Sequence, residues 1–243
     1  MRFSTIGLAA LPLIVAATQQ ESPIDQFKNQ AQYYANKFQS YIPNPSKSFT
    51  VDSAHAAAAK AGGKTLSILR LGDWRDIITS SVKPTRTTPE EWWVLVSGGN
   101  KTCFGHCGNV ETAFNETAAL FAANPTAPHL AYLNCENEPV LCNSWGVGPP
   151  TLWIMHVAAP PAPVDIHGVY LNATTTTVKT FTDLHSTESW KETPLYEGIF
   201  HPFNGPLAQY GLNVPLGYVL WVFAVVPSWL FMIGISFISR NIM

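Results

Sequence analysis

The sequence predicts an α/β domain, a mixed sheet with helices on both faces, between a helical N-terminal extension and a C-terminal transmembrane helix. Three observations lead to this expectation. Strand-like and helix-like segments alternate between residues 64 and 187. An apolar stretch without a charge runs from Val214 to Ile238. Charged residues make up 12% of the chain, against about 25% in ordinary soluble domains, which indicates that part of the chain does not face water.

Residues 1–17 have the pattern of a secretory signal peptide. Met1 and Arg2 give a short basic start, and residues 6–17 are apolar and end in small side chains. A short N-terminal membrane anchor is the alternative. The apolar run is shorter than the roughly 20 residues that a spanning helix needs, so we expect cleavage.

Residues 18–63 are expected to form a helical extension. After Ser22 and Pro23, which suit a helix start, apolar side chains recur every three or four positions. A second, alanine-rich helix is expected over residues 53–60, before a glycine pair. The apolar stripe of the first helix packs on its own domain or, alternatively, binds a partner.

Residues 64–187 carry the α/β domain. Runs rich in β-branched and aromatic residues predict strands, and apolar residues spaced three or four apart predict helices. The expected strands cover residues 65–71, 90–97, 129–134, 151–157 and 164–171. The expected helices cover residues 73–81, 107–123, 138–145 and 178–185.

Residues 214–238 are expected to cross the membrane as one helix and thus to contact lipid. At 1.5 Å per residue the stretch reaches roughly 37 Å, enough to span with some tilt. Pro227 is expected to kink the helix. Arg240 assigns the tail, residues 239–243, to the cytosol by the positive-inside rule. The chain is therefore expected to be a single-pass type I protein of the secretory pathway.

Residues 188–213 form the juxtamembrane segment. They are rich in proline, glycine and aromatic residues, which is unlike a flexible linker. We expect them either to lie along the membrane surface or to pack under the domain.

Glycosylation sequons and cysteines agree with a lumenal position. Asn100, Asn115 and Asn172 each begin an Asn-x-Thr sequon, so the protein is expected to be a glycoprotein. An even number of cysteines, four, indicates two disulfides in an oxidising compartment.

Composition excludes some classes of ligand. With 14 basic and 16 acidic residues the chain has a formal net charge of −2, so no nucleic-acid partner is expected. The cysteine spacing does not match paired zinc knuckles, and no phosphate loop or paired-histidine motif is present. We therefore expect neither a metal nor a cofactor.

The stretch from Thr65 to His185 resembles the thioredoxin-like superfamily, and most closely the domains of the protein disulfide isomerase family. The sequence FGHC that ends at Cys107 is similar to the family's redox site. The sequence LNCENEPVLCNSWGV, which begins at Leu133, is similar to the family's segment of strand, short helix and Tyr-Gly-Val. Gly148-Pro149-Pro150-Thr151 stands where the family carries a cis-proline before a strand.

The resemblance implies roles for individual residues. Cys103 would be the attacking cysteine at the start of a helix, where the helix dipole favours a thiolate. Cys107 would be the resolving cysteine, and His106 would tune the thiolate. Pro149 and Pro150 would shape the substrate groove. The remaining pair, Cys135 and Cys142, is expected to form a structural disulfide.

Two functions remain open at this point. The first is a membrane-anchored thiol–disulfide oxidoreductase or isomerase of the endoplasmic reticulum that acts on secretory-pathway polypeptides. The second is a redox-inactive thioredoxin-fold scaffold or chaperone-like subunit of a membrane complex, similar in fold to lumenal subunits of oligosaccharyltransferase. In the second case the disulfide between Cys103 and Cys107 would be structural only.

Overall fold

The computed structural model describes residues 64–82, 88–122, 124 and 126–242. The expected signal peptide and helical extension lie outside the described residues. A five-stranded sheet forms the centre, in the order β1-β3-β2-β4-β5. Its strands are β1 Ser67–Ile68, β2 Glu90–Ser97, β3 His129–Asn134, β4 Thr151–Val157 and β5 Asp165–Tyr170. β1, β3 and β2 are parallel, whereas β4 and β5 run antiparallel, so the expected mixed sheet is confirmed.

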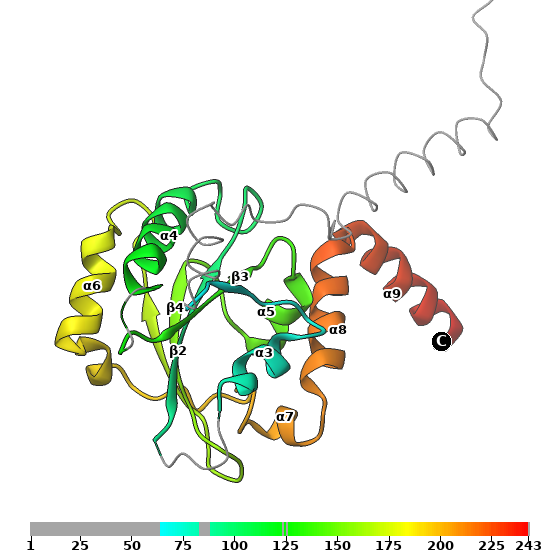
Figure 1. Cartoon of the computed structure of the whole chain (residues 1–243). Helices are drawn as coiled ribbons and strands as arrows, with labels where there is room; N and C mark the ends of the chain where they lie inside the picture. The colour runs from blue at the N-terminus through cyan, green and yellow to red at the C-terminus, as the bar shows by residue number, and fades with distance from the viewer. Residues whose placement is uncertain (1–63, 83–87, 123, 125, 243) are drawn as a thin grey trace, which may run out of the picture. The chain divides into compact units, whose positions relative to one another are not determined.

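Helices cover both faces of this sheet. Figure 1 shows α4 (Gly108–Ala122) and α6 (Val178–Thr187) on one side. On the other side lie α3 (Trp74–Ser80) and α5 (Pro139–Trp145). β2 is buried on both faces because both are covered, which is why most of its residues are apolar rather than alternating.

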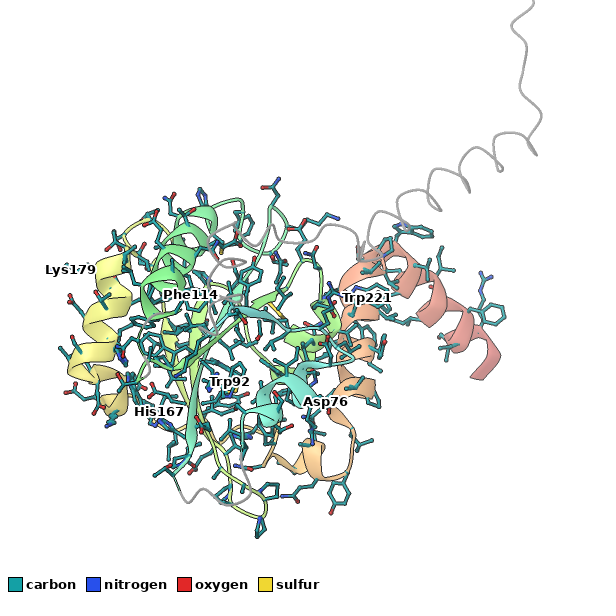
Figure 2. All side chains as sticks on the ribbon, in the orientation of Figure 1. Asp76, Trp92, Phe114, His167, Lys179 and Trp221 are labelled. Carbon is teal, nitrogen blue, oxygen red and sulfur yellow. A yellow bond between two sulfur atoms is a disulfide. The ribbon has the colours of Figure 1, made fainter. Side chains whose placement is uncertain are left out.

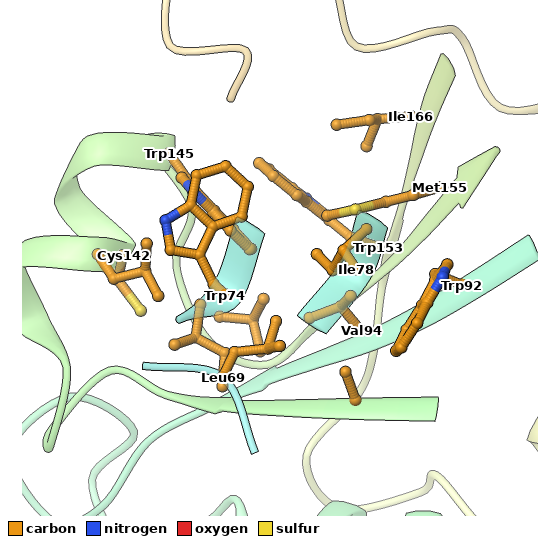
Figure 3. Close-up of a cluster of buried hydrophobic side chains, with 14 of the residues drawn as sticks. Leu69, Trp74, Ile78, Trp92, Val94, Cys142, Trp145, Trp153, Met155 and Ile166 are labelled. Carbon is orange, nitrogen blue, oxygen red and sulfur yellow. The ribbon is translucent and has the colours of Figure 1, made fainter. Parts of the chain in front are cut away.

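Two hydrophobic cores result, one on each side of the sheet. Under α4 and α6, Trp93 and Leu95 of β2 pack with Phe114 and Phe181. On the opposite face Trp92 packs with side chains from α3, α5 and β4. Figure 3 shows this second core, in which the labelled side chains are Leu69, Trp74, Ile78, Trp92, Val94, Cys142, Trp145, Trp153, Met155 and Ile166. Figure 2 labels Phe114, which belongs to the first core, and Trp92, which belongs to the second.

The expected strand over residues 65–71 is shorter in the structure. Only Ser67 and Ile68 pair with β3, opposite Ala131 and Tyr132. β1 lies at the edge of the sheet, so the length of its pairing is set by one neighbour only. The other strands begin and end within one residue of the expected bounds.

The segment over residues 188–213 packs against the domain. It contains a 3₁₀ helix, η1 (Ser189–Glu192), and α7 (Pro206–Gln209). Trp190 is buried and packs on the rings of His156 and His167. Leu195 forms an isolated β-bridge with His167, which ties the segment to β5.

The apolar C-terminal stretch forms two helices instead of the single helix that we expected. α8 (Asn213–Val225) and α9 (Ser228–Ile242) meet at an angle of 103°. Val226 between them is extended, with φ −70° and ψ 125°, because the residue before a proline avoids the helical conformation. In the described part of the chain, no single helix has both the length and the hydropathy of a membrane span. Within the same residues, only the bent pair α8 and α9 has both when its two helices are taken together.

Candidate functional site

The loop between β2 and α4 carries the first disulfide. Cys103 and Cys107 are bonded, and their Cα atoms are 5.8 Å apart. The backbone N–H of Cys103 donates to the carbonyl of Gly99 at 3.0 Å, and that of His106 donates to the carbonyl of Cys103 at 3.0 Å. Cys107 directly precedes the first residue of α4. Both sulfurs therefore lie at a helix N-terminus, where the dipole stabilises a thiolate.

The tip of this loop faces solvent. Phe104 has a φ of 51° and is 82% exposed, and Gly105 follows with a φ of 74°. His106 is also exposed. Behind the tip, Cys103 is 6% exposed and Cys107 is 1% exposed. Cys103 is thus the cysteine that is more open to another molecule.

The proline loop before β4 faces the same place. The bond between Pro149 and Pro150 is cis. A Cβ added to Gly98 would lie 3.1 Å from Cγ of Pro149 and 2.0 Å from Oγ1 of Thr102. Pro149 therefore lies close to the backbone that leads into Cys103, and a side chain at position 98 would require Thr102 to shift.

The second disulfide follows β3, the strand that pairs with β2. Cys135 and Cys142 join the end of β3 to α5, with Cα atoms 5.5 Å apart. The N–H of Cys135 donates to the carbonyl of Ser97 at 2.8 Å. All four cysteines are therefore in disulfides, in agreement with the expectation from their even number.

A polar network under the first loop was not foreseen from the sequence. Glu111 lies in the first turn of α4, and its Oε1 accepts a hydrogen bond from Oγ of Ser97 at 2.5 Å. The same oxygen accepts a second bond, at 2.7 Å, from the hydroxyl of Tyr132. Asn134 donates to that hydroxyl at 3.1 Å. Ser97 is fully buried and Tyr132 is 2% exposed, whereas Glu111 and Asn134 are partly exposed.

Burial and, after it, the nearby Glu111 carboxylate raise the pKa of Tyr132. The phenol therefore stays protonated and acts as a donor to Glu111. One feature of the sequence could have suggested this position. Glu111 follows Cys107 by four residues, which is the spacing of side chains on one face of a helix.

The three sequons have different surroundings. Asn172 is exposed, and its Oδ1 accepts bonds from the backbone and hydroxyl of Thr174 at 2.9 and 2.8 Å. Asn100 is exposed in the disulfide loop. Asn115 lies inside α4 with its Oδ1 buried, and Thr117 of the same sequon is fully buried. Among the described residues, no group of three His, Cys, Asp or Glu side chains is arranged to hold a metal ion.

A family model described as "tRNA hydrolases-like, Thioredoxin-like domain" matches residues 52–223. No curated protein matches the chain. The J-Trx1 fragment of ERdj5 is 16% identical, with 53% of this chain and 51% of that one covered and a TM-score of 0.36. The first thioredoxin domain of mouse Protein disulfide-isomerase A4 is 15% identical, with 67% and 100% covered and a TM-score of 0.38. This chain spans about half the length of the first of these two structures.

Proposed function

The chain belongs to the family of tRNA hydrolase-like, thioredoxin-like domains, and we propose that it is a membrane-anchored thiol–disulfide oxidoreductase of the endoplasmic reticulum. Its substrates are secretory-pathway polypeptides. The observation that carries the proposal is the disulfide between Cys103 and Cys107 at the start of α4, in a loop that begins near Pro149 at Gly98. The name of the family also mentions tRNA hydrolysis. We do not propose that activity, because a net charge of −2 gives no excess of basic residues for RNA.

The reaction follows from the two sulfurs. In the oxidising direction, a substrate thiolate attacks Sγ of Cys103, and Cys107 leaves as a thiolate. A second substrate thiolate then attacks the substrate sulfur of the mixed disulfide. The bond to Cys103 breaks, and the substrate leaves with a new disulfide while both cysteines of the protein are reduced. Two electrons have passed from the substrate to the protein.

Exposure and charge support these roles. Cys103 is more exposed than Cys107, so it is the sulfur that the substrate reaches. The N-terminus of α4, a helix of 15 residues, favours the thiolate that forms when the bond opens. His106, exposed beside the pair, would add positive charge when protonated. The substrate would approach between Phe104 and Pro149.

The membrane anchor in this proposal is the α8–α9 pair. Many of its large apolar side chains are exposed in the described structure, Met232, Ile235 and Phe237 each by more than half. Arg240 is the one basic residue of α9 and lies near its end. A lipid phase would remove this apolar surface from water.

A second function, a redox-inactive scaffold within a membrane complex, is favoured by one observation. Pro149 precedes the cis-proline and has no N–H with which to bind the backbone of an extended peptide. Under this alternative the Cys103–Cys107 bond stays closed, and its only role is to stabilise the loop between β2 and α4.

Mass spectrometry of the full chain in graded glutathione buffers separates the two functions. We expect the Cys103–Cys107 bond to open at the glutathione poise of the endoplasmic reticulum while the protein remains folded. The Cys135–Cys142 bond is the internal control and should stay closed. Near-ultraviolet circular dichroism of the buried tryptophans reports folding in the same samples. A Cys103–Cys107 bond that opens only as this signal is lost would overturn the oxidoreductase proposal.

A further inference from the structure

The sequon that begins at Asn100 lies inside the disulfide loop. All of its residues, 100–102, are exposed, and Cys103 follows directly. The sequon at Asn115 differs, because its Thr117 is fully buried. A glycan on Asn100 is therefore compatible with the folded domain. Its attachment point would lie three residues before the more exposed sulfur of the disulfide.

The loop folds back, so that the side chain of Asn100 lies beside the loop tip. The carbonyl of Gly99 accepts bonds from the backbone N–H groups of Cys103 and Gly105, at 3.0 and 3.4 Å. A Cβ added to Gly105 would lie 3.0 Å from Oδ1 of Asn100. Gly105 follows Cys103 by two residues, so their Cα atoms are at most about 7.6 Å apart. The amide that would carry the glycan thus lies next to the segment that joins the two cysteines.

The backbone on both sides of Asn100 is held in place. Before it, the carbonyl of Gly99 has the two bonds described above. After it, the backbone N–H of Lys101 donates to Oε2 of Glu136 at 3.3 Å. The same carboxylate fills the space where a side chain at position 99 would lie. The first sugar of a glycan would therefore start from a fixed place beside the loop tip.

We propose that a glycan on Asn100 is a size filter for the redox site, which admits small thiols and disulfides to Cys103 and excludes polypeptides. This inference rests on the proposed function, and it names a form of regulation of the same site. N-linked glycans are bulky and lie at the surface. Exchange requires the attacking sulfur to reach one sulfur of the disulfide directly.

The two kinds of partner differ in how much space they need at the loop. A molecule of the size of glutathione passes beside the sugars, because the loop tip faces open solvent at Phe104. A polypeptide must also place the chain on both sides of its cysteine against the loop, where the glycan lies. The form without this glycan is therefore the one that acts on polypeptides. The glycosylated form exchanges with small thiols only.

A glycan that only adds solubility is the alternative, since N-linked glycans are solubilising. The two roles differ in their dependence on the size of the reacting partner. A solubilising glycan leaves the rates with small and large partners in the same ratio. A size filter lowers the rate with the large partner alone.

The test measures the attack of Cys103 on two disulfides that share one leaving group. The protein is the full chain with Cys107→Ala, made in a secretory host and reduced with glutathione. The small probe is dithiobis(nitrobenzoic acid). The large probe is an unfolded polypeptide whose single cysteine carries thionitrobenzoate. The Cys103 thiolate attacks the sulfur bonded to the leaving group, a disulfide to Cys103 forms, and thionitrobenzoate is released and measured by its absorbance.

Two further substitutions in this chain place a glycan on one sequon at a time. Thr174→Ala leaves the sequon of Asn100, and Asn100→Gln leaves that of Asn172. The double variant has neither and gives the rate without a glycan. With the large probe, Thr174→Ala should react about tenfold more slowly than the double variant, at the low end of the range over which association rates vary among variants of one interface. With the small probe the rates should be equal.

The glycan on Asn172 is the matched control. It lies at the same end of the sheet, because the backbone N–H of the neighbouring Leu171 donates to the carbonyl of Pro150 at 3.2 Å. Asn100→Gln, which keeps this glycan, should nevertheless react with the large probe like the double variant. Trimming the glycan of Thr174→Ala to a single sugar with an endoglycosidase should raise its rate with the large probe only.

Several results would overturn the size filter and leave the proposed function standing. They are an unoccupied Asn100 in glycopeptide mass spectrometry of Thr174→Ala, equal rates of Thr174→Ala and the double variant with the large probe, and a glycan that slows both probes equally. A rate of Asn100→Gln as low as that of Thr174→Ala with the large probe has the same consequence. If Cys103 of the folded double variant reacts with neither probe, the proposed function fails and the size filter falls with it.

Discussion

Gly217 of α8 lies directly against Val140 of α5: a Cβ added at position 217 would be 2.6 Å from the carbonyl oxygen of Val140. It would also lie 3.0 Å from Cβ of Ser144. The start of the apolar C-terminal stretch is thus packed on the domain, and α5 is itself joined to β3 by the Cys135–Cys142 disulfide. On the proposed function, the domain would be held close to the membrane without a flexible linker.

Replacing Gly217 with valine should weaken this contact. The added side chain has to displace backbone and not merely a flexible side chain, which typically costs about 1–3 kcal/mol. We expect faster amide hydrogen exchange in α5 and α8. Gly234→Val is the control, because a Cβ at position 234 meets nothing within 4 Å. Unchanged exchange in Gly217→Val would show that α8 is not packed as described.

Trp145 should be among the most important residues for stability. It is 1% exposed, stacks on Trp153 at 5.3 Å between ring centroids and meets Trp74 edge-on at 5.1 Å. Trp145→Ala should lower the free energy of unfolding by about 3–5 kcal/mol in urea titrations. Tyr170→Ala, at a position that is 88% exposed, should change it little. Equal effects of the two substitutions would contradict the assignment of the core.

Acidification should destabilise the segment over residues 188–213 through His201. Burial lowers the pKa of His201, and its Nδ1 accepts bonds from the backbone N–H groups of Phe203 and Asn204 at 3.2 and 2.9 Å. The unfolded chain, with an ordinary histidine pKa of about 6.5, therefore takes up the proton first as the pH falls. The neutral His201 therefore makes its full contribution to the free energy of unfolding above the ordinary histidine pKa. That contribution is lost as the pH falls below it.

The free energy of unfolding should therefore decrease as the pH is lowered from about 7.5 to about 5.5, a range that includes the ordinary histidine pKa. Burial also lowers the pKa of His129 and of His156, so they act in the same direction. In His201→Gln the slope should be shallower but not zero. A slope in His201→Gln equal to that of the unchanged protein would refute the role of His201.

Glycan occupancy should differ between two of the sequons. Asn172 and Thr174 are exposed, whereas Thr117 is fully buried and its Oγ1 donates to the carbonyl of Ala113 at 2.7 Å. A glycosyltransferase that must read Thr117 could reach it in the folded protein only if α4 left the sheet. In folded protein made in a secretory host we expect a glycan on Asn172 and none on Asn115. Glycopeptide mass spectrometry measures the glycan occupancy of both sites. Thr174→Ala is the control, because it removes the sequon of Asn172.

The layers of the fold could be predicted from the sequence because β2 and β4 are apolar on both faces. Such strands must be covered on both sides, and the intervening helical spacings supply the cover. The extent of β1 could not be predicted in this way, because it depends on how many residues of one partner, β3, lie within pairing distance.

From residue spacing alone, the site was predictable only where its residues are close in sequence. Cys103 and Cys107 are four residues apart before a helix, so their proximity is local. The contact between Glu111 and Tyr132 joins residues 21 apart, and it exists because α4 crosses the sheet next to β3. Hydropathy likewise identified the apolar stretch after Val214. It did not show that Gly217 packs on α5. A kink was expected at Pro227, but the sequence did not show that the chain would divide there into two helices bent by 103°.

The most direct test of thiol–disulfide exchange is the Cys107→Ala variant of the full chain, incubated with an unfolded secretory polypeptide that carries one disulfide. Without Cys107 to resolve it, a mixed disulfide to Cys103 should accumulate and be located there by peptide mass spectrometry. The double variant Cys103→Ala, Cys107→Ala should show none. If the single variant forms no more adduct than the double variant, the protein does not exchange disulfides through Cys103.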